Sequence, residues 1–475
     1  MDNDSDLVEL KKTDFGNGSM TRIILRQAIP LIVAQFTLLL YNTVDRIFIG
    51  HIEGIGKVAL TGLGITFPIV TFISAVTLLF GLGGTPLFSI ARGEEKIEEA
   101  RSVMGNSFVL LGVSSFVLMA ISYVFMSPIL YSFGASDITY VYASSYLYIY
   151  LLGTPFLMLG NGMNYYITAQ GFPKTAMITT LGGAILNLLF DPLFIFVFDL
   201  GIKGAAIATV LSQLISFAWV MSFIVSKKAI IKLTRSALKI KGAIVKGILA
   251  LGIPNFIMNG TNALVQVLCN KSLNYYGGDD YVTIMTVIQS VRALLNVVIN
   301  AVTSGSQPVL GFNYGAKKYN RVAQGIKINI ALGLIYTAVA WVFIIIFPDI
   351  FIKMFIAKED ATPELINMGV HYMRIYFMAF IFMSFQLAGQ STFMALGKAK
   401  PAIFFSLLRK VFIIVPFTLV LPLVLADKPS GVFWAEPISN VIGGLASFLT
   451  MYFFVYRRLN SEEGIRKLLE RKTGL

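Results

Sequence analysis

Twelve long apolar stretches follow one another along this 475-residue chain, and they limit its fold more than any other feature. Each has about 20 residues or more, enough for a helix to cross the ~30 Å hydrocarbon core of a bilayer. Only 13% of the residues are charged, against about a quarter in soluble proteins. We therefore expect an all-α integral membrane protein with twelve transmembrane helices, at 28–50, 60–90, 103–127, 138–170, 175–198, 201–226, 247–276, 281–310, 324–356, 365–396, 401–425 and 431–456.

The basic residues indicate which side of the membrane each connection faces. If the N-terminus is cytoplasmic, 27 of the 38 Lys and Arg lie in or beside the connections on the inner side. The outer connections hold five, Lys57, Lys203, Lys353, Lys358 and Lys428. Because basic residues accumulate on the cytoplasmic side of membrane proteins, we expect both termini in the cytoplasm. The net charge of +13 is then a consequence of topology, and we expect no nucleic-acid partner.

The second half of the chain repeats landmarks of the first. Pro30, in Ala-Ile-Pro, is matched 224 residues later by Pro254 in Gly-Ile-Pro. Ala169-Gln-Gly171 is matched 226 residues later by Ala395-Leu-Gly397. Each half holds six spans, so both halves insert with the same polarity. We expect two pseudo-symmetric six-helix lobes with a cavity between them. The predicted parts are an N-lobe at 1–226, a basic cytoplasmic linker at 227–246, a C-lobe at 247–456 and a cytoplasmic tail at 457–475.

The linker carries seven basic residues with apolar ones between them. Such a segment favours the surface of an anionic inner leaflet, so membrane lipids are expected partners. A simple solvated connection is the alternative.

Two carboxylates occupy spans that are otherwise apolar, Asp45 in the first and Asp191 in the fifth. Each costs about 2.5–3.5 kcal/mol to insert at the centre of a bilayer. Counted from the cytoplasmic ends of their spans, the two residues lie at about 28 Å and 26 Å. Asn187 lies one turn below Asp191 on the same face, and Thr209 in the sixth span reaches a similar height. We expect these four side chains to converge, with Asn161 and Asn164 of the fourth span somewhat deeper.

An oxygen-rich cluster of this kind suits a proton or Na⁺, since two adjacent buried acids favour one shared proton and neutral oxygens can bind a small hard cation. The alternative is a structural pair neutralised by a base within the spans, such as Arg46. Because Arg46 directly follows Asp45, its side chain points to a different side of the helix.

With these residues identified, the chain resembles the multidrug and toxic compound extrusion (MATE) family, in particular its bacterial MepA-like and DinF-like branch. The resemblance is carried by Asp45-Arg-Ile-Phe-Ile-Gly50, Asn161-Gly-Met-Asn164, Ala169-Gln-Gly171 with Pro173, and Asn187-x-x-x-Asp191-Pro192. These motifs occur in order, and the six-plus-six repeat matches over the whole length.

The resemblance implies a V-shaped antiporter of the bacterial inner (plasma) membrane. It would expel small organic compounds or drugs, often cationic, in exchange for H⁺ or Na⁺, by alternating access. Residues matching Asp45, Asn187, Asp191 and Thr209 would bind the coupling ion, with Na⁺ as the possible metal, and Asn161 and Asn164 would support them. The first helix would bend at Pro30. Spans seven and ten lack the acids of the NorM-like pattern, so we place coupling in the N-lobe. We expect a monomer without cofactors.

Glu436, in the twelfth span, could attract a cationic drug or could lie in a wet vestibule at the start of a Pro-broken helix; both interpretations stay open. No nucleophile, base and acid set is visible, so we do not expect an enzyme or a catalytic residue. The closest rival function is a lipid-linked oligosaccharide flippase of the wider superfamily, which would need a strongly basic cavity for pyrophosphate. A membrane-bound transferase would need an acidic metal motif or a catalytic His, and neither is found.

Overall fold

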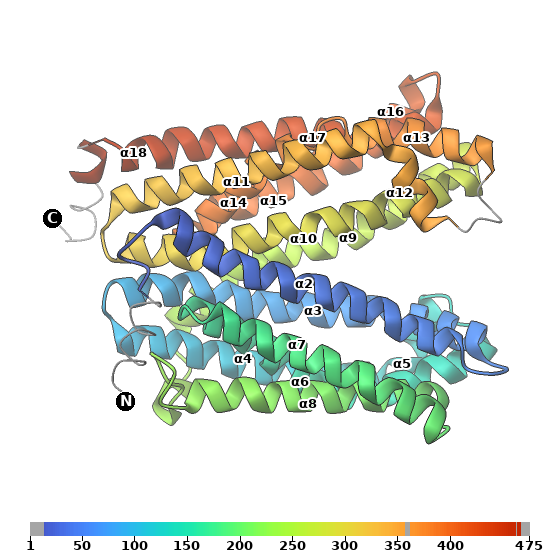
Figure 1. Cartoon of the computed structure of the whole chain (residues 1–475), viewed down its shortest axis with the longest axis horizontal. Helices are drawn as coiled ribbons and strands as arrows, with labels where there is room; N and C mark the ends of the chain where they lie inside the picture. The colour runs from blue at the N-terminus through green and yellow to red at the C-terminus, as the bar shows by residue number, and fades with distance from the viewer. Residues whose placement is uncertain (1–13, 357–361, 462, 467–475) are drawn as a thin grey trace. The chain divides into compact units, whose positions relative to one another are not determined.

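The computed structural model describes residues 14–356, 362–461 and 463–466, and every regular element within them is helical (Figure 1). Most of the predicted tail, 467–475, and the first 13 residues lie outside the described residues. The elements of the first half are α2 (Met20–Gly50), α3 (Gly56–Gly93), α4 (Ile97–Val124), α5 (Met126–Ser132), α6 (Asp137–Ala169), α7 (Pro173–Pro192), η1 (Leu193–Val197), α8 (Gly201–Val225), η2 (Arg235–Leu238) and α9 (Gly242–Gly277). Those of the second half are α10 (Asp279–Gly315), α11 (Tyr319–Ile346), α12 (Pro348–Phe355), α13 (Pro363–Phe377), α14 (Phe382–Ala395), α15 (Ala399–Leu407), η3 (Leu408–Ile414), α16 (Val415–Val424), α17 (Lys428–Met451), η4 (Tyr452–Tyr456) and α18 (Arg457–Leu459).

These helices form two compact units. The first unit comprises residues 1–14 and 29–256, and the second comprises 15–28 and 257–475. In the first unit α6 is central and packs against α3, α4, α7 and α8, which run beside it in Figure 1. In the second unit α17 has the corresponding place and packs against α13, α14 and α16.

The units differ from the predicted lobes at two helices. The boundary falls inside α9, at residue 256, rather than in the linker, and the start of α2 up to Ala28 belongs to the second unit. Both helices are continuous across these boundaries. The first turns of α9 pack closely on the first unit, and the first turns of α2 pack closely on the second unit. A Cβ on Gly252 of α9 would lie 1.9 Å from the Leu79 carbonyl oxygen of α3. The repeat gives the second unit the same contact, because a Cβ on Gly305 of α10 would lie 3.0 Å from the backbone nitrogen of Ala28.

The membrane-spanning prediction is confirmed for most of the chain. Ten helices of the described residues are long and apolar enough to cross a bilayer, and the bent pair α13 and α14, with an angle of 43° between them, makes an eleventh. The remaining predicted span, 138–170, is the 33-residue helix α6. It is not among the ten because seven tyrosines and several small polar residues lower its hydropathy. A capping box between Ser136 and Thr139 fixes where α6 begins.

The basic linker is bound to the first unit rather than solvated along its whole length. Its Ile231 is fully buried and donates its backbone N–H to Gln170 Oε1 at 2.9 Å. Asn106 of α4 accepts from the backbone N–H of Lys241 at 2.8 Å and donates to the Lys239 carbonyl at 3.0 Å. Six of the seven basic residues are nevertheless exposed, so the segment presents positive charge outward while its backbone is held in place.

Close packing at Gly252 gives a stability prediction. We expect Gly252→Ala to lower the free energy of unfolding by about 1–3 kcal/mol, because its Cβ would overlap the α3 backbone. Gly64→Ala is the matched control, since no atom lies within 4 Å of its added Cβ and alanine has the higher helix propensity. Thermal unfolding of purified protein measures both variants, and equal melting temperatures for the two would contradict the packing argument.

Candidate functional site

The structure brings the two predicted acids together inside the first unit. Asp45 of α2 is 8% exposed and Asp191 of α7 is 0% exposed. Their carboxyl groups lie within hydrogen-bonding reach of each other. Neighbouring Phe48 and Phe196 make an edge-to-face contact at 6.3 Å between ring centroids, which holds the C-terminal end of α2 against η1. Two helices far apart in sequence thus contribute one acid each to a buried pair.

Asn187 and Thr209 complete the predicted cluster. Both are buried, and Asn187 Nδ2 lies 3.4 Å from Asp191 Oδ1 and 3.4 Å from Thr209 Oγ1. Turning the Asn187 amide over improves this geometry, since Nδ2 then donates to Asp191 Oδ2 at 3.1 Å and Oδ1 accepts from the Thr209 backbone N–H at 3.3 Å. Asn187 therefore links the acid on α7 to α8.

One oxygen of the pair is left without a donor. Asp45 Oδ1 is buried and accepts no hydrogen bond from any residue that the structure describes. It therefore has no donor when both carboxylates are ionised. A buried acceptor of this kind is costly unless a proton, a cation or water satisfies it. Arg46 does not do so, because it is exposed and its guanidinium lies 5.6 Å from the centre of the Phe67 ring.

Three tyrosines surround the acid pair, and the sequence analysis did not identify them. Tyr41 of α2 and Tyr146 of α6 lie within electrostatic range of Asp45, and the Tyr146 hydroxyl is within hydrogen-bonding reach of the Thr209 hydroxyl. Tyr150 stacks on Tyr146 with 5.6 Å between ring centroids. The signal available in the sequence was the spacing of Tyr146 and Tyr150, four residues apart, which places them on one face of α6.

A cavity of about 90 Å³ opens beside the acid pair, within the first unit. Asn187 and Tyr41 line it together with Asn161, Thr180 and Gln213. A single water needs about 10–15 Å³ measured in this way, so the cavity has room for several. Water in the cavity can therefore reach Asn187, the side chain that contacts Asp191.

Asn161 and Asn164, predicted as a supporting pair, lie in different surroundings and make different contacts. Asn161 is exposed and lines the cavity. Asn164 instead joins α6 to α7: its Nδ2 donates to the Ala176 carbonyl at 3.0 Å and to Thr180 Oγ1 at 3.1 Å, and its Oδ1 accepts from Thr179 Oγ1 at 3.3 Å. It reaches the cavity only through Thr180.

Prolines interrupt the helices that carry the site. Pro192 cannot donate to the Leu188 carbonyl as a helical residue would, and α7 gives way there to the π-helix η1. Such π-helical turns are frequent at functional sites. Pro30, the predicted hinge, is a buried residue inside α2, two residues after Ala28, where the helix passes from the second unit to the first.

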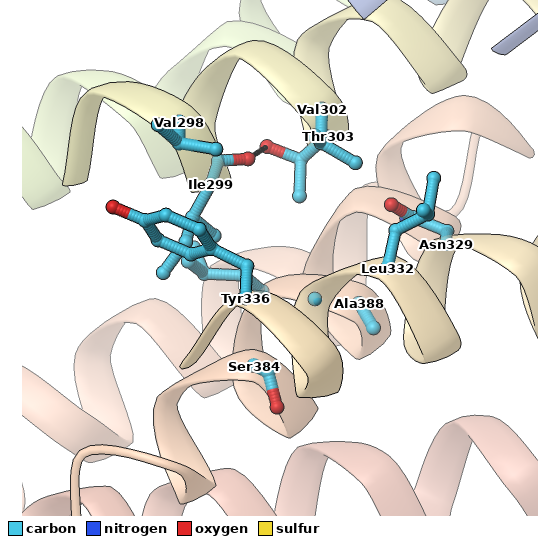
Figure 2. A pocket seen from close by; sticks show the side chains of 11 residues that line it. Val298, Ile299, Val302, Thr303, Asn329, Leu332, Tyr336, Ser384 and Ala388 are labelled. Carbon is cyan, nitrogen blue, oxygen red and sulfur yellow. Dashed lines mark hydrogen bonds between the residues drawn. The ribbon is translucent and has the colours of Figure 1, made fainter. Parts of the chain in front are cut away.

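Among the residues that the structure describes, the second unit has no counterpart of the acid pair. With the 224-residue offset of Pro30 and Pro254, which also relates Pro192 to Pro416, Asp45 corresponds to Cys269, Asp191 to Val415 and Thr209 to Phe433. Figure 2 shows a small cavity of this unit, of about 10 Å³, whose lining residues include Thr303, Asn329, Tyr336 and Ser384 and no acid. It holds about one water.

Glu436 is buried in an ion-pair cluster of the second unit. Its Oε1 lies 2.5 Å from a terminal nitrogen of Arg409 and 3.1 Å from one of Arg292. The carboxylate is 7% exposed and already paired twice. This arrangement does not favour its attracting a cationic drug, and it differs from the wet vestibule that the nearby Pro437 suggested.

Comparison with known protein families finds one match in each half of the chain. The sequence model of the MatE family matches residues 30–193 and again residues 254–420. The chain is 22% identical over 440 residues to the multidrug export protein MepA of Staphylococcus saprophyticus, covering 92% of this chain and 95% of that protein. It is equally identical to MepA of Staphylococcus haemolyticus over 446 residues, covering 94% and 95%.

Solved structures show the same fold. One is described as an outward-facing conformation of a multidrug resistance MATE family transporter of the MOP superfamily. It superposes with a TM-score of 0.87 at 20% identity, covering 95% of this chain and 99% of that one. A second, a crystal structure of MATE in the bent conformation, superposes with a TM-score of 0.86 at 21% identity, covering 98% and 99%.

The different places of the two asparagines give a second prediction. We expect Asn164→Ala to destabilise the protein by about 1–3 kcal/mol, because it removes three hydrogen bonds between α6 and α7. Asn161→Ala, at an exposed position of the same helix, should change stability by no more than about 0.5 kcal/mol. Thermal unfolding in detergent measures both. If Asn161→Ala lowered the stability more than Asn164→Ala, the structural role assigned here to Asn164 would be wrong.

Proposed function

The chain belongs to the MatE family, and we propose that it is a multi-pass membrane antiporter that exports drugs in exchange for a cation. The relatives' names supply the class of cargo, drugs of several kinds, and the family resemblance implies small organic compounds that are often cationic. The coupling ion is H⁺ or Na⁺, bound in the first unit at Asp45 and Asp191 with Asn187 and Thr209. The observation that carries the proposal is the buried Asp45 Oδ1, which lacks a donor beside a second buried carboxyl group.

A proton or Na⁺ satisfies this site in different ways. A proton shared between the two carboxyl groups supplies the missing donor and removes one of two negative charges. Na⁺ would instead take both acids and the neutral oxygens of Asn187 and Thr209 as ligands, since hard cations prefer oxygen. The cavity beside Asn187 gives either ion an aqueous approach.

The proposed cycle is alternating access. An ion that enters from outside binds at the pair, α2 bends near Pro30 and the drug is released outward. The ion then leaves on the cytoplasmic side as the transporter takes up the next drug molecule. Pro30 supports this step because it removes one hydrogen bond of α2 next to the residue at which the helix changes unit.

A flippase for lipid-linked oligosaccharides is the second candidate, and one observation favours it. The second unit buries Arg409 and Lys410 beside the half-buried Arg292, and these three bases could bind a phosphate group. It ranks behind the antiporter because the acid pair of the first unit would repel pyrophosphate, whereas it suits a cation.

The acid pair gives the central functional prediction. We expect Asp45→Asn and Asp191→Asn each to slow gradient-driven dye efflux from cells or vesicles by at least about tenfold, because an amide cannot take up a proton and binds Na⁺ weakly. Asp199→Asn is the matched control: Asp199 is exposed, eight residues beyond Asp191, and should leave efflux unchanged. Wild-type, gradient-dependent efflux in both acid variants would remove the coupling site.

The number of ions per drug follows from a voltage-only experiment. One charge moving through 100 mV supplies ~2.3 kcal/mol, enough for roughly 50-fold accumulation. The vesicles are held without a pH gradient or a Na⁺ gradient. Exchange of one ion for one monovalent cationic drug moves no net charge, so voltage should drive no accumulation. A two-ion cycle, for which two carboxylates leave room, should accumulate drug under voltage alone. Drug accumulation that does not depend on the voltage, the pH gradient or the Na⁺ gradient would exclude antiport.

A further inference from the structure

The second unit buries a group of charged side chains that the export cycle does not use. Arg292 comes from α10, Arg409 and Lys410 from η3, and Glu436 from α17. Arg409, Lys410 and Glu436 are 1%, 2% and 5% exposed. All four lie within helices that are apolar enough to span a membrane.

The acid holds the two arginines and not the lysine. Glu436 Oε1 accepts from terminal nitrogens of Arg409 at 2.5 Å and Arg292 at 3.1 Å. A terminal nitrogen of Arg409 also donates to Asn440 Oδ1 at 2.7 Å, and one of Arg292 donates to the Tyr376 hydroxyl at 2.8 Å. Lys410 makes no hydrogen bond or ion pair with any residue that the structure describes, although it lies within electrostatic range of the other three.

The charges of this group do not balance. Three bases face one acid, and Glu436 is the only acidic side chain among the described residues that forms an ion pair with them. Two donors are unused, the ammonium of Lys410 and Nε of Arg409, which is buried without a partner. A net positive charge left inside a low-dielectric region is strongly unfavourable unless a counter-ion neutralises it or a base such as Lys410 releases its proton.

Arg409 and Lys410 follow each other in the chain, and their side chains lie within electrostatic range of each other. Residues 408–414 form the π-helix η3, two residues before Pro416, and such turns often mark functional sites. At the 224-residue offset, the first unit has Ile185 and Leu186 where the second has Arg409 and Lys410. The basic pair is therefore a property of the second unit alone and not of the repeated scaffold.

We propose that Arg409 Nε and Lys410 Nζ, beside the Glu436–Arg292 pair, bind one small anion: a halide or the carboxylate group of an organic compound. Two donors suit an anion with one or two acceptor atoms, and a guanidinium together with an ammonium provides charge-assisted hydrogen bonds. Bound there, the anion lowers the net charge of the group and satisfies Arg409 Nε. This site does not depend on the export function or on the acid pair of the first unit.

The test is anion-dependent thermal stability of the purified, full-length protein. Chloride and acetate are titrated separately from about 0.1 to 100 mM, with bulky isethionate keeping the ionic strength constant. A ligand of the folded state raises the melting temperature by mass action and in a saturable way. Saturable stabilisation by chloride alone identifies an inorganic anion, and stabilisation by acetate identifies a carboxylate. Stabilisation by neither anion overturns the proposal.

Three variants separate binding from structure. Lys410→Met should weaken the apparent anion affinity by about tenfold or more, since it removes one of the two donors. Glu436→Gln should strengthen it by roughly tenfold, because it removes the competing negative charge. Arg374→Gln, at an exposed site of the same unit, should leave it unchanged. Opposite shifts for Lys410→Met and Glu436→Gln support binding, whereas wild-type affinity in Lys410→Met overturns it even if Glu436→Gln fails to fold.

Discussion

The cost of charge inside an apolar helix bundle is the constraint on which this structure depends. Each carboxylate of the first unit costs about 2.5–3.5 kcal/mol to place at the centre of a bilayer, and two ionised acids side by side repel each other as well. The chain offsets only part of this cost, through Asn187, which lies 3.4 Å from both Asp191 and Thr209. The remaining cost is the reason that we propose a bound positive charge as part of the most favourable state of this site.

The repeat explains why one scaffold carries two different polar centres. The close contact of Gly83 with Gly252 recurs as that of Gly305 with Ala28, so the backbone packing is shared by both units. Hydrophobic packing tolerates any apolar side chain of suitable volume, and the positions of Asp45 and Asp191 could therefore become Cys269 and Val415. The charged residues differ in sign, with acids in the first unit and bases in the second, whereas Pro30 and Pro192 have the counterparts Pro254 and Pro416 at the 224-residue offset.

Much of this could be predicted from the sequence, and the limits have a physical reason. Hydropathy located the helices, and the rise per residue gave Asp45, Asp191, Asn187 and Thr209 a common height. Height along a helix does not determine which neighbour a side chain faces. For this reason the sequence predicted neither the tyrosines around the acids nor the pairing of Glu436 with two arginines. Asn161 and Asn164 are close in sequence and were expected to act together, although one lines a cavity and the other joins two helices.

The acid pair can drive a conformational change only if its two members move relative to each other. An ion shifts an equilibrium by its difference in affinity for the two states, and a change from 1:99 to 99:1 needs about 5.5 kcal/mol. Two charges 4 Å apart interact by about 4 kcal/mol at an effective dielectric constant of 20. Asp45 lies on α2, 15 residues beyond Pro30, and Asp191 lies on α7. A bend of α2 that separates the acids would therefore change the ion affinity by the order of magnitude that the proposed cycle needs. With a rigid α2 the ion would bind both states equally and could not shift the equilibrium between them.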